Sequence, residues 1–597
     1  MIDGVLENDI WKGLAWIDKQ YPLSNIKQIE IIYGPASALY GANAFQGIIN
    51  IVTKNGLDNS NLINTSIGYG SYNTFITEIM IGKKINNFDF NFTFRKYNSN
   101  ENDLSEYKDW DYIIPNGENF SFPVDKYINP KDNIAFHWKM KYKGFSFGGV
   151  LWDRADYSGM TYVDSYLSGT KYAANFNSPW HIRNMHSYIM YETDISANIH
   201  SQTRISLFNH EHLPSSNAIG LSYTDSMFVT FFHEKSQRAM FEQQFNFNFN
   251  FNKVKNFLTI GIQYKYSNIQ GNYEKLTIGY PIGGTFPITP DISDFKTHDI
   301  YLTKDLGIYF QEVIKPIDNL SIILGSRFDY NKIRKDGGFG WVFNPRLGLV
   351  YFPFKKLNIK MLYGSGFSPA TNWTLYSTTY SRQANPNLAP EIVNSHEISS
   401  GYKILNSLYI EAAYYFNFYK NRASVVKYPS GVLDPENPDI IERNEAIGNW
   451  SITGFELRIK FNYQNFAVIG NYSYSNPFDI DTKLEIGNIG NTANLIVNYK
   501  ISKHINFNLR TNWIGERNSF LRDSNNVFLL TIKPAFIANS TLIIKNLFVK
   551  NLSFSITINN IFDSEYFDPG MRSGTGKYPA KLPQNGRFLF FKLSYSF

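Results

Sequence analysis

Apolar and polar residues alternate with a period of two through most of this 597-residue chain. Phe and Asn alternate without interruption from Phe245 to Asn252. Similar alternation occurs at 88–95, 455–461, 505–510 and 591–597. Successive side chains of a β-strand point to opposite faces, so each of these segments has one apolar and one polar face. A half-buried soluble sheet gives the same local pattern, but its repetition with large aromatic residues and almost no helical periodicity favours strands with a lipid-facing side and a wet side.

Aromatic residues make up 17% of the chain, with 49 Phe and 41 Tyr. Aromatic girdles at the two membrane interfaces are one place where transmembrane barrels use such residues. The sequence has no apolar run close to the roughly 18 residues that indicate a membrane-spanning helix. Only helices and closed barrels satisfy every backbone polar group in lipid. A chain of this kind that spans a membrane therefore does so as a closed barrel.

Short polar connections alternate with mostly longer connections that are polar or rich in Gly and Pro. The short ones lie near 84–87, 141–145, 192–197, 252–256, 315–320, 353–357, 404–407, 461–465, 500–504 and 546–551. The others lie near 70–72, 98–130, 153–182, 211–226, 267–303, 331–341, 365–394, 420–449, 474–491, 515–529 and 563–586. Together they join 22 strands, and short turns on one side with long loops on the other are typical of outer-membrane barrels. A barrel of this size has a lumen wide enough to need a plug.

Composition and motifs exclude several functional classes. The net charge is only +6, so no nucleic-acid partner is expected, and the absence of cysteine excludes disulfides and thiol catalysis. No P-loop, dinucleotide-binding or GxSxG pattern occurs, so we expect no enzyme and no cofactor, with an outer-membrane hydrolase as the alternative from the enzyme class. His210 and His212 would share one face at a strand end and could bind a metal or haem. Water-exposed loop histidines are favoured instead, so no metal site is expected.

Residues 1–56 differ from the rest of the chain. They are less aromatic, contain the segment GPASALYGANAFQG, and end in an apolar strand that runs from Ile48 to Val52. We therefore expect a small domain, or part of one, at 1–56 and the barrel at 57–597.

The segment from Ile26 to Gly56, IKQIEIIYGPASALYGANAFQGIINIVTKNG, resembles the end of the plug domain of TonB-dependent receptors. The residues that carry this motif are Glu30, Tyr33, Gly34, Pro35, Leu39, Tyr40, Gly41 and Gly47. Further segments resemble barrel motifs of the same family in the family's order: YGSGFSPA at 363–370, NPNLAPE at 385–391, NWSITGFELRIK at 449–460 and NNIFDSEY at 559–566. The resemblance covers essentially the whole chain.

This resemblance implies an all-β fold, a 22-stranded antiparallel transmembrane β-barrel with a partial N-terminal plug domain inside the lumen. It implies that the protein lies in the outer membrane of a Gram-negative bacterium, in contact with outer-membrane lipid. It also implies that the TonB–ExbB–ExbD complex supplies the energy for transport. It also implies a receptor of the siderophore or vitamin type for a scarce small-molecule nutrient, and we expect a ferric siderophore or a similar metal chelate. A passive or leaky pore, and an importer of glycans or oligopeptides from the same family, remain alternatives.

Two departures from the family pattern affect these expectations. Residues 1–5, MIDGV, resemble the middle of the family's plug, so the resemblance predicts that the signal peptide and the TonB box precede Met1. A chain without that box is expected to perform no active transport alone. The family usually has Arg at the position of Tyr33, and this Arg typically pairs with wall carboxylates that correspond to Glu391 and Glu456. Plug contact and an ordinary solvated position in the lumen remain equally open for these two residues.

Aromatic residues in the predicted extracellular loops can stack on sugar, catecholate or corrin faces. The candidates are Trp110, Tyr112, Tyr157, Tyr162, Tyr166, Trp180, Trp373, Tyr376 and Tyr380. For any single candidate, a place in the interfacial girdle or in loop packing is the favoured alternative.

Overall fold

The computed structural model describes residues 1–59, 62–105, 107, 112–113, 119–120, 129–157, 179–221, 227–278, 300–333, 337–376, 378, 382–436, 438, 440–481, 484–485, 490–522, 527–570 and 581–597. Among these residues, no helix has both the length and the apolar character needed to cross a membrane.

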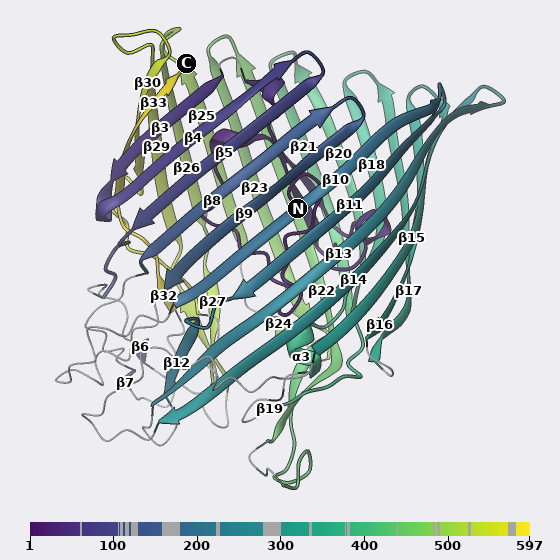
Figure 1. Cartoon of the computed structure of the whole chain (residues 1–597), viewed down its shortest axis with the longest axis vertical. Coiled ribbons are helices and arrows are strands. Elements are labelled where there is room, and N and C mark those ends of the chain that lie inside the picture. Colours follow the sequence, from purple (N-terminus) through teal and green to yellow (C-terminus); the bar gives the residue numbers. More distant parts are fainter. Residues whose placement is uncertain are drawn as a thin grey trace.

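Twenty-two antiparallel strands form a closed barrel, as the sequence predicts (Figure 1). Pairing of the first wall strand, β3, with the last, β33, closes the cylinder. The wall strands are β3 (Ile63–Gly70), β4 (Thr74–Ile85), β5 (Phe88–Ser99), β8 (Lys131–Tyr142), β9 (Phe145–Tyr157), β10 (Pro179–Ser196), β11 (Ile199–His212), β13 (Met227–Phe251), β14 (Val254–Ile278), β15 (Ile300–Ile317), β16 (Leu320–Ile333), β17 (Gly337–Phe354), β18 (Leu357–Ser368), β20 (Glu391–Leu405), β21 (Leu408–Lys427), β22 (Glu442–Tyr463), β23 (Phe466–Asp479), β25 (Asn491–Lys500), β26 (Ile505–Ile514), β29 (Ala535–Lys545), β30 (Leu552–Asn559) and β33 (Phe588–Ser596).

Shorter elements lie in the connections on the long-loop side. They are β6 (Tyr112–Ile113), β7 (Asn119–Phe120), β12 (Asn217–Leu221), β19 (Arg382–Gln383), β24 (Leu484–Glu485), β27 (Arg517–Arg522), β28 (Val527–Ile532), β31 (Phe567–Pro569), β32 (Lys581–Pro583) and the helix α3 (Asn372–Tyr376). Figure 1 shows most of these elements at the end of the barrel opposite the C-terminus.

All ten predicted short turns join consecutive wall strands. Asn86 and Lys143 adopt positive φ values of 52° in two of these turns, a conformation that tight hairpin connections need. The predicted boundaries of the long loops are less accurate. The loop expected at 267–303 is shorter, because β14 continues to Ile278 and β15 begins at Ile300. Strands that rise above the membrane have water on both faces, so they can keep their ladder of hydrogen bonds without the alternation that marks the membrane-spanning part.

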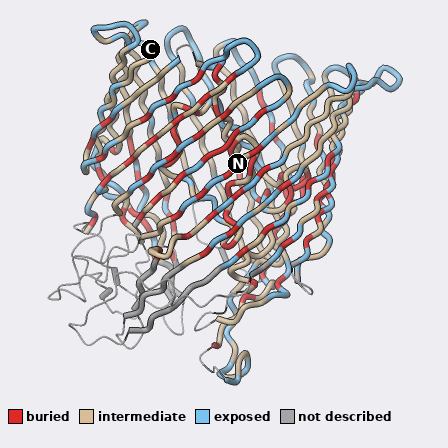
Figure 2. Tube along the Cα trace, in the orientation of Figure 1, coloured by how far each residue is buried: buried red, intermediate tan, exposed pale blue. Residues whose placement is uncertain are grey.

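The wall presents apolar side chains outward and polar side chains to the lumen. On β5, Phe88 is 41% exposed, whereas Asp89, Asn91 and Thr93 are buried at 8%, 2% and 1% exposure. Figure 2 shows buried positions alternating along the wall strands at the level of the plug. The lipid-facing exterior expected from the period of two is therefore present.

Residues 1–59 run through the lumen, where the N-terminus also lies (Figure 1). Their regular elements are η1 (Leu23–Asn25), β1 (Ile26–Tyr33), α1 (Ser37–Tyr40), β2 (Gly47–Thr53) and η2 (Gly56–Asp58), while η3 (Ser71–Asn73) follows β3. β1 and β2 form an antiparallel pair, and Ile2 bridges to Ile51 beside it. At Gly47, with φ of 151°, a Cβ atom would lie 2.5 Å from the Ile32 carbonyl oxygen, so this turn accepts only glycine.

A charge on the outer face of the wall is expected to destabilise the barrel far more than the same charge on the inner face. Phe310 is 43% exposed and lies seven residues before the short-turn end of β15, inside the apolar band of about 25 Å. Phe310→Arg should lower the free energy of unfolding by about 2–4 kcal/mol. Chemical unfolding in lipid vesicles measures this effect.

The matched control is Gln311→Arg, because Gln311 lies on the same strand and faces the inside of the barrel, at a space between plug and wall that also contacts Met1 and Tyr40. Equal destabilisation by the two substitutions would contradict the assignment of the two faces.

Candidate functional site

Arginines of the barrel wall hold the plug by its backbone. Each guanidinium donates a hydrogen bond of 2.8–3.2 Å to a plug carbonyl oxygen. The bonds join Arg204 to Gly4, Arg238 to Leu6 and Arg327 to Leu39. Because a backbone carbonyl is present whatever the side chain, no plug motif in the sequence could identify these contacts.

Hydrogen bonds to other wall residues hold the Arg327 side chain in place. Its Nε donates to Asp329 at 2.8 Å and one terminal nitrogen donates to Gln263 at 3.1 Å, so the guanidinium is oriented within the wall. A Cβ atom at Gly307 would lie 1.9 Å from the guanidinium. The glycine therefore provides the space in which Arg327 reaches the plug.

Buried acidic residues complete the attachment of the plug. Asp3 pairs with Lys139 at 3.0 Å. Glu7 accepts hydrogen bonds from Asn184 at 3.2 Å and Tyr21 at 3.1 Å, and it pairs with His186. Burial raises the pKa of Glu7, but the opposite charge and hydrogen bond of His186 outweigh it and lower the pKa to about 2. Glu7 therefore stays ionised inside the barrel.

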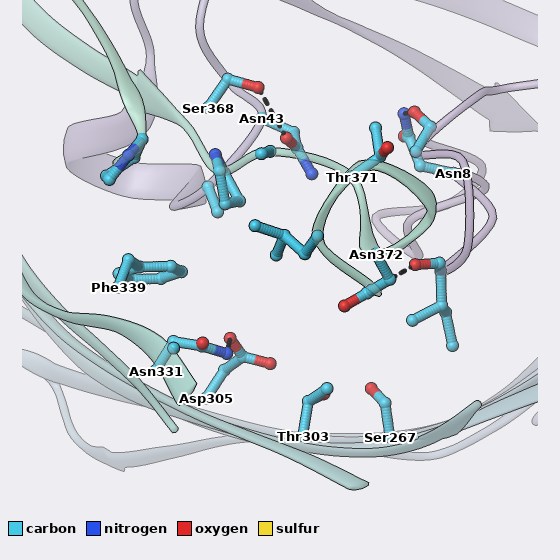
Figure 3. Close-up of a pocket in the computed structure, with 18 of the residues that line it drawn as sticks. Asn8, Asn43, Ser267, Thr303, Asp305, Asn331, Phe339, Ser368, Thr371 and Asn372 are labelled. Carbon is cyan, nitrogen blue, oxygen red and sulfur yellow. Dashed lines mark hydrogen bonds between the residues drawn. The ribbon is translucent and has the colours of Figure 1, made fainter. Parts of the chain in front are cut away.

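A cavity of ≈ 200 Å³, here called the luminal cavity, lies where plug, wall and a long loop meet (Figure 3). The plug contributes Asn8, Asp9, Ile10, Lys12 and Asn43. The wall contributes Arg238, Lys265, Ser267, Thr303, Asp305, Asn331 and Phe339. The last residue of β18 and the segment after it contribute Ser368 to Asn372. Three hydrogen bonds fix its rim: Ser368 to Asn43 at 3.1 Å, Asn372 to the Ile10 carbonyl at 2.6 Å and Asn331 to Asp305 at 2.7 Å.

Aromatic rings pack around plug residues 11–16, next to this cavity. Trp373 lies edge-on to Trp11 at 6.3 Å, and Trp180 stacks on Trp16 at 6.0 Å. The Lys12 ammonium lies 4.1 Å from the centroid of the Trp180 ring. Two of the predicted loop aromatics, Trp180 and Trp373, thus contact the plug directly.

The remaining loop candidates divide into two groups. Tyr376, on α3, packs with Trp373 against the cluster of Trp11 and Ile269. Tyr112 and Tyr157 belong to β6 and β9, but their side chains lie outside the described part of the structure. Trp110, Tyr162, Tyr166 and Tyr380 lie outside the described residues altogether.

The plug motif and the two wall glutamates are not in one cluster. Tyr33 is 59% exposed in the lumen. Glu391 accepts a hydrogen bond from the Ala423 amide at 2.9 Å and lies 3.9 Å from Arg422, a cation of the wall. Glu456 is half-buried on β22, with Ala413 and Ser473 as its neighbours in register.

Other motif residues support the plug itself. Glu30 accepts from Gln28 at 2.6 Å and Asn50 at 2.8 Å. Gly41, with φ of 80°, has the Arg327 guanidinium where a Cβ atom would be, at 2.9 Å.

His210 and His212 are not the water-exposed loop residues that the sequence favours. They lie at the end of β11 with exposures of 1% and 0%. Their ligand atoms and a carboxylate oxygen of Asp9 all lie within 4.8 Å of one another. The expectation of exposed histidines is wrong, because the plug covers the lumen face on which their period of two places them.

Comparisons with known proteins agree with this architecture. The family described as "TonB dependent receptor-like, beta-barrel" matches residues 87–561. The chain belongs to the TonB-dependent receptor family. The closed transmembrane β-barrel and the family membership together place the protein in the outer membrane of a Gram-negative bacterium.

Solved structures of receptors have the same fold at low sequence identity. A mutant of the ferric enterobactin receptor PfeA from Pseudomonas aeruginosa superposes with a TM-score of 0.75 at 14% identity, over 100% of this chain and 90% of that chain. The siderophore receptor PirA from Acinetobacter baumannii gives 0.73 at 16% identity, with the same two coverages. The ferripyoverdine receptor of Pseudomonas aeruginosa gives 0.71 at 16% identity, over 96% and 77%.

A curated relative matches only a short segment. The vitamin B12 transporter BtuB of Vibrio vulnificus (strain CMCP6) is 34% identical over 71 residues, which are 12% of this chain and 11% of that transporter. The match therefore spans about a tenth of that relative's length.

Sequence reasoning missed several residues of the site: Trp11, Lys12, Trp16, Arg238 and Lys265. The first three lie in a segment without a motif, and the other two are ordinary inward-facing positions of the alternating pattern. Only their convergence on one cavity distinguishes them.

Filling the space beside Arg327 should loosen the plug. Gly307→Ala pushes a methyl group into the guanidinium, which must leave its partners, and overpacking of this kind costs about 1–3 kcal/mol. We expect a lower melting temperature and more frequent conducting events in planar bilayers.

Gly325→Ala on the neighbouring strand is the control, because the nearest atom to its new methyl group is 3.5 Å away. If the two variants conduct alike, Arg327 does not restrain the plug.

Proposed function

We propose that this protein is a receptor that binds a ferric siderophore or a similar anionic metal chelate at the luminal cavity, for import powered through TonB. One observation carries the proposal: the cavity is lined by plug and wall together. A ligand in the cavity contacts both the plug and the wall, so its binding free energy can favour a different position of the plug relative to the wall.

The charges around the cavity suit an anion. Its lining includes three cations, Lys12, Arg238 and Lys265, and two carboxylates, Asp9 and Asp305. In a partly enclosed site, an excess of positive charge acts on a ligand more strongly than at an exposed surface. Ferric complexes of catecholate or carboxylate chelators commonly carry negative charge, whereas neutral glycans gain little from such a lining.

The neighbouring aromatic residues add apolar contact area. Trp373 and Tyr376 lie on or beside the loop segment that closes the cavity, and Leu375 and Phe339 line it. Rigid aromatic rings provide large contact areas at a small cost in conformational entropy. The volume of ≈ 200 Å³ is below the roughly 300–1,000 Å³ of typical ligand pockets, so it suits a compact chelate or one part of a larger one.

Removal of one cationic side chain from the cavity should weaken the binding of an anionic chelate more than the binding of a neutral ligand. Lys265→Met is expected to raise the Kd for an anionic ferric chelate by about 10- to 100-fold, the cost of one charge-assisted contact. Quenching of tryptophan fluorescence during titration with ferric catecholate, ferric hydroxamate, cobalamin and oligosaccharide probes measures this directly.

Lys255→Met is the matched control, because Lys255 lies at the short-turn end of the same strand and pairs with Asp318 at 3.0 Å. Equal losses in both variants, or binding of the oligosaccharide in preference to every chelate, would overturn the proposed ligand class. Uptake that persists in cells without TonB would overturn the proposed coupling.

A further inference from the structure

Four buried side chains from plug and wall converge beside the luminal cavity; here they are called the His/carboxylate cluster: Asp9, His210, His212 and Glu234. Glu234 lies on β13 directly opposite His212 on β11, and His210 is one diagonal position away. Glu234 Oε2 is 3.7 Å from His210 Nε2 and 3.8 Å from His212 Nδ1. Asp9 approaches the two histidines from the plug, with a carboxylate oxygen within 4.8 Å of their ring nitrogens.

The wall members of the cluster are almost fully buried, yet several of their polar atoms have no hydrogen-bond partner. The side chains of His210, His212 and Glu234 are 0%, 0% and 2% exposed. Both ring nitrogens of His212, Nε2 of His210 and both oxygens of Glu234 lack a partner among the described residues. Burying polar groups without partners costs roughly 1–3 kcal/mol each, and more for charged groups. One bound ligand could satisfy these donors and acceptors together.

Neighbouring residues hold the His210 ring and the Asp9 carboxylate in their orientations. His210 Nδ1 lies 3.2 Å from Asn184 Oδ1, and an amide oxygen can only accept, so the proton sits on Nδ1 and the lone pair on Nε2. Metal-binding histidines are oriented by this kind of outer partner. On the plug, the Asp9 carboxylate accepts from the Gly13 amide at 3.0 Å and from Trp16 Nε1 at 3.2 Å.

We propose that the His/carboxylate cluster binds a divalent transition-metal ion of the zinc class, which ties the plug to the barrel wall. Imidazole nitrogen with carboxylate oxygen is a donor set that suits Zn²⁺ and its transition-metal neighbours, whereas Mg²⁺ and Ca²⁺ prefer oxygen alone. Two histidines and two carboxylates supply the four ligands of a tetrahedral site. The proposal does not depend on which chelate the receptor imports.

The separations fit this chemistry after a small contraction. Zinc bonds to nitrogen and oxygen are about 2.0–2.2 Å long, so two ligands of one ion lie at most about 4.4 Å apart. The distances from Glu234 to the histidines are within this limit, and the widest separation among Asp9, His210 and His212 is at most 4.8 Å. Movement of the Asp9 side chain by a few tenths of an ångström brings Asp9, His210 and His212 within bonding distance of one ion. Glu234, which is close to both histidines, has to approach Asp9 further to complete the four ligands.

The surroundings keep water out and limit the affinity. Trp16 and Trp180 lie edge-on to His212, at 5.7 Å and 5.6 Å between ring centroids. Lys12, whose ammonium lies over Trp180, interacts electrostatically with both Asp9 and Glu234. A bound cation therefore competes with Lys12 for these carboxylates. Removal of the Lys12 charge should strengthen metal binding if the cluster is a metal site.

The test is direct metal binding by the full chain, folded in detergent and stripped with a chelator. Zn²⁺ is titrated in competition with a chromophoric indicator, with no siderophore present, so the result is independent of the proposed ligand. We expect one Zn²⁺ per chain and a rise in melting temperature on binding. Mg²⁺ should neither bind nor displace Zn²⁺.

Variants assign the ion to the cluster. Asp9→Asn, His212→Gln and Glu234→Gln should each weaken binding by more than about 100-fold, and Asn184→Ala, which removes an outer partner, by about 10- to 100-fold. Lys12→Met should bind Zn²⁺ more tightly. The control is His200→Gln on the same strand, since His200 is 38% exposed and pairs with Asp194; it should bind like the parent. Heat-modifiable electrophoretic mobility confirms that each variant is a folded barrel.

Three results would overturn the proposal. The first is substoichiometric Zn²⁺ in the folded parent chain. The second is unchanged binding in both Asp9→Asn and His212→Gln. The third is a Lys12→Met variant with a lower melting temperature and no higher affinity for Zn²⁺ than the parent chain. That result would identify the Lys12 ammonium, and not a metal ion, as the cation that balances the two carboxylates.

Discussion

The backbone of a chain in lipid has no water to bond with, and the closed barrel of this protein follows from that constraint. Each wall strand forms backbone hydrogen bonds with a neighbour on both sides. Because β3 pairs with β33, the sheet has no free edge. Closure at this number of strands encloses a lumen too wide for side chains alone to fill. Residues 1–59 occupy this lumen.

The inner face of the barrel is polar, so the plug is held by hydrogen bonds and charges more than by a hydrophobic core. Wall arginines bind plug carbonyls, and carboxylates such as Asp3 and Glu7 enter ion pairs with the wall. Apolar clusters do exist, as around Ile2 and Trp152, but they are small. Contacts of this kind are specific in geometry, and each can be exchanged for hydrogen bonds to water separately.

The two candidate sites share a plug residue. Asp9 lines the luminal cavity and also belongs to the His/carboxylate cluster. An ion on the cluster would fix the segment that carries Asp9 and Lys12, and so would set the shape and charge of the cavity floor. Ligand binding at the cavity and metal binding at the cluster are therefore expected to influence each other through this single loop of the plug.

The sequence by itself determined the strand number, the ten short turns and the inward or outward direction of most wall residues. A period of two under the membrane constraint requires a closed barrel, and the alternating short and long connections give its number of strands. The motif at Glu30 to Gly47 resembles the plug that lies inside. Tertiary structure alone decided the environment of each inward residue. His210 is buried and Gln311 faces a cavity, although both occupy equivalent positions in the pattern. The difference depends on where the plug touches the wall, and contacts between residues some 200 positions apart leave no periodic trace in the sequence.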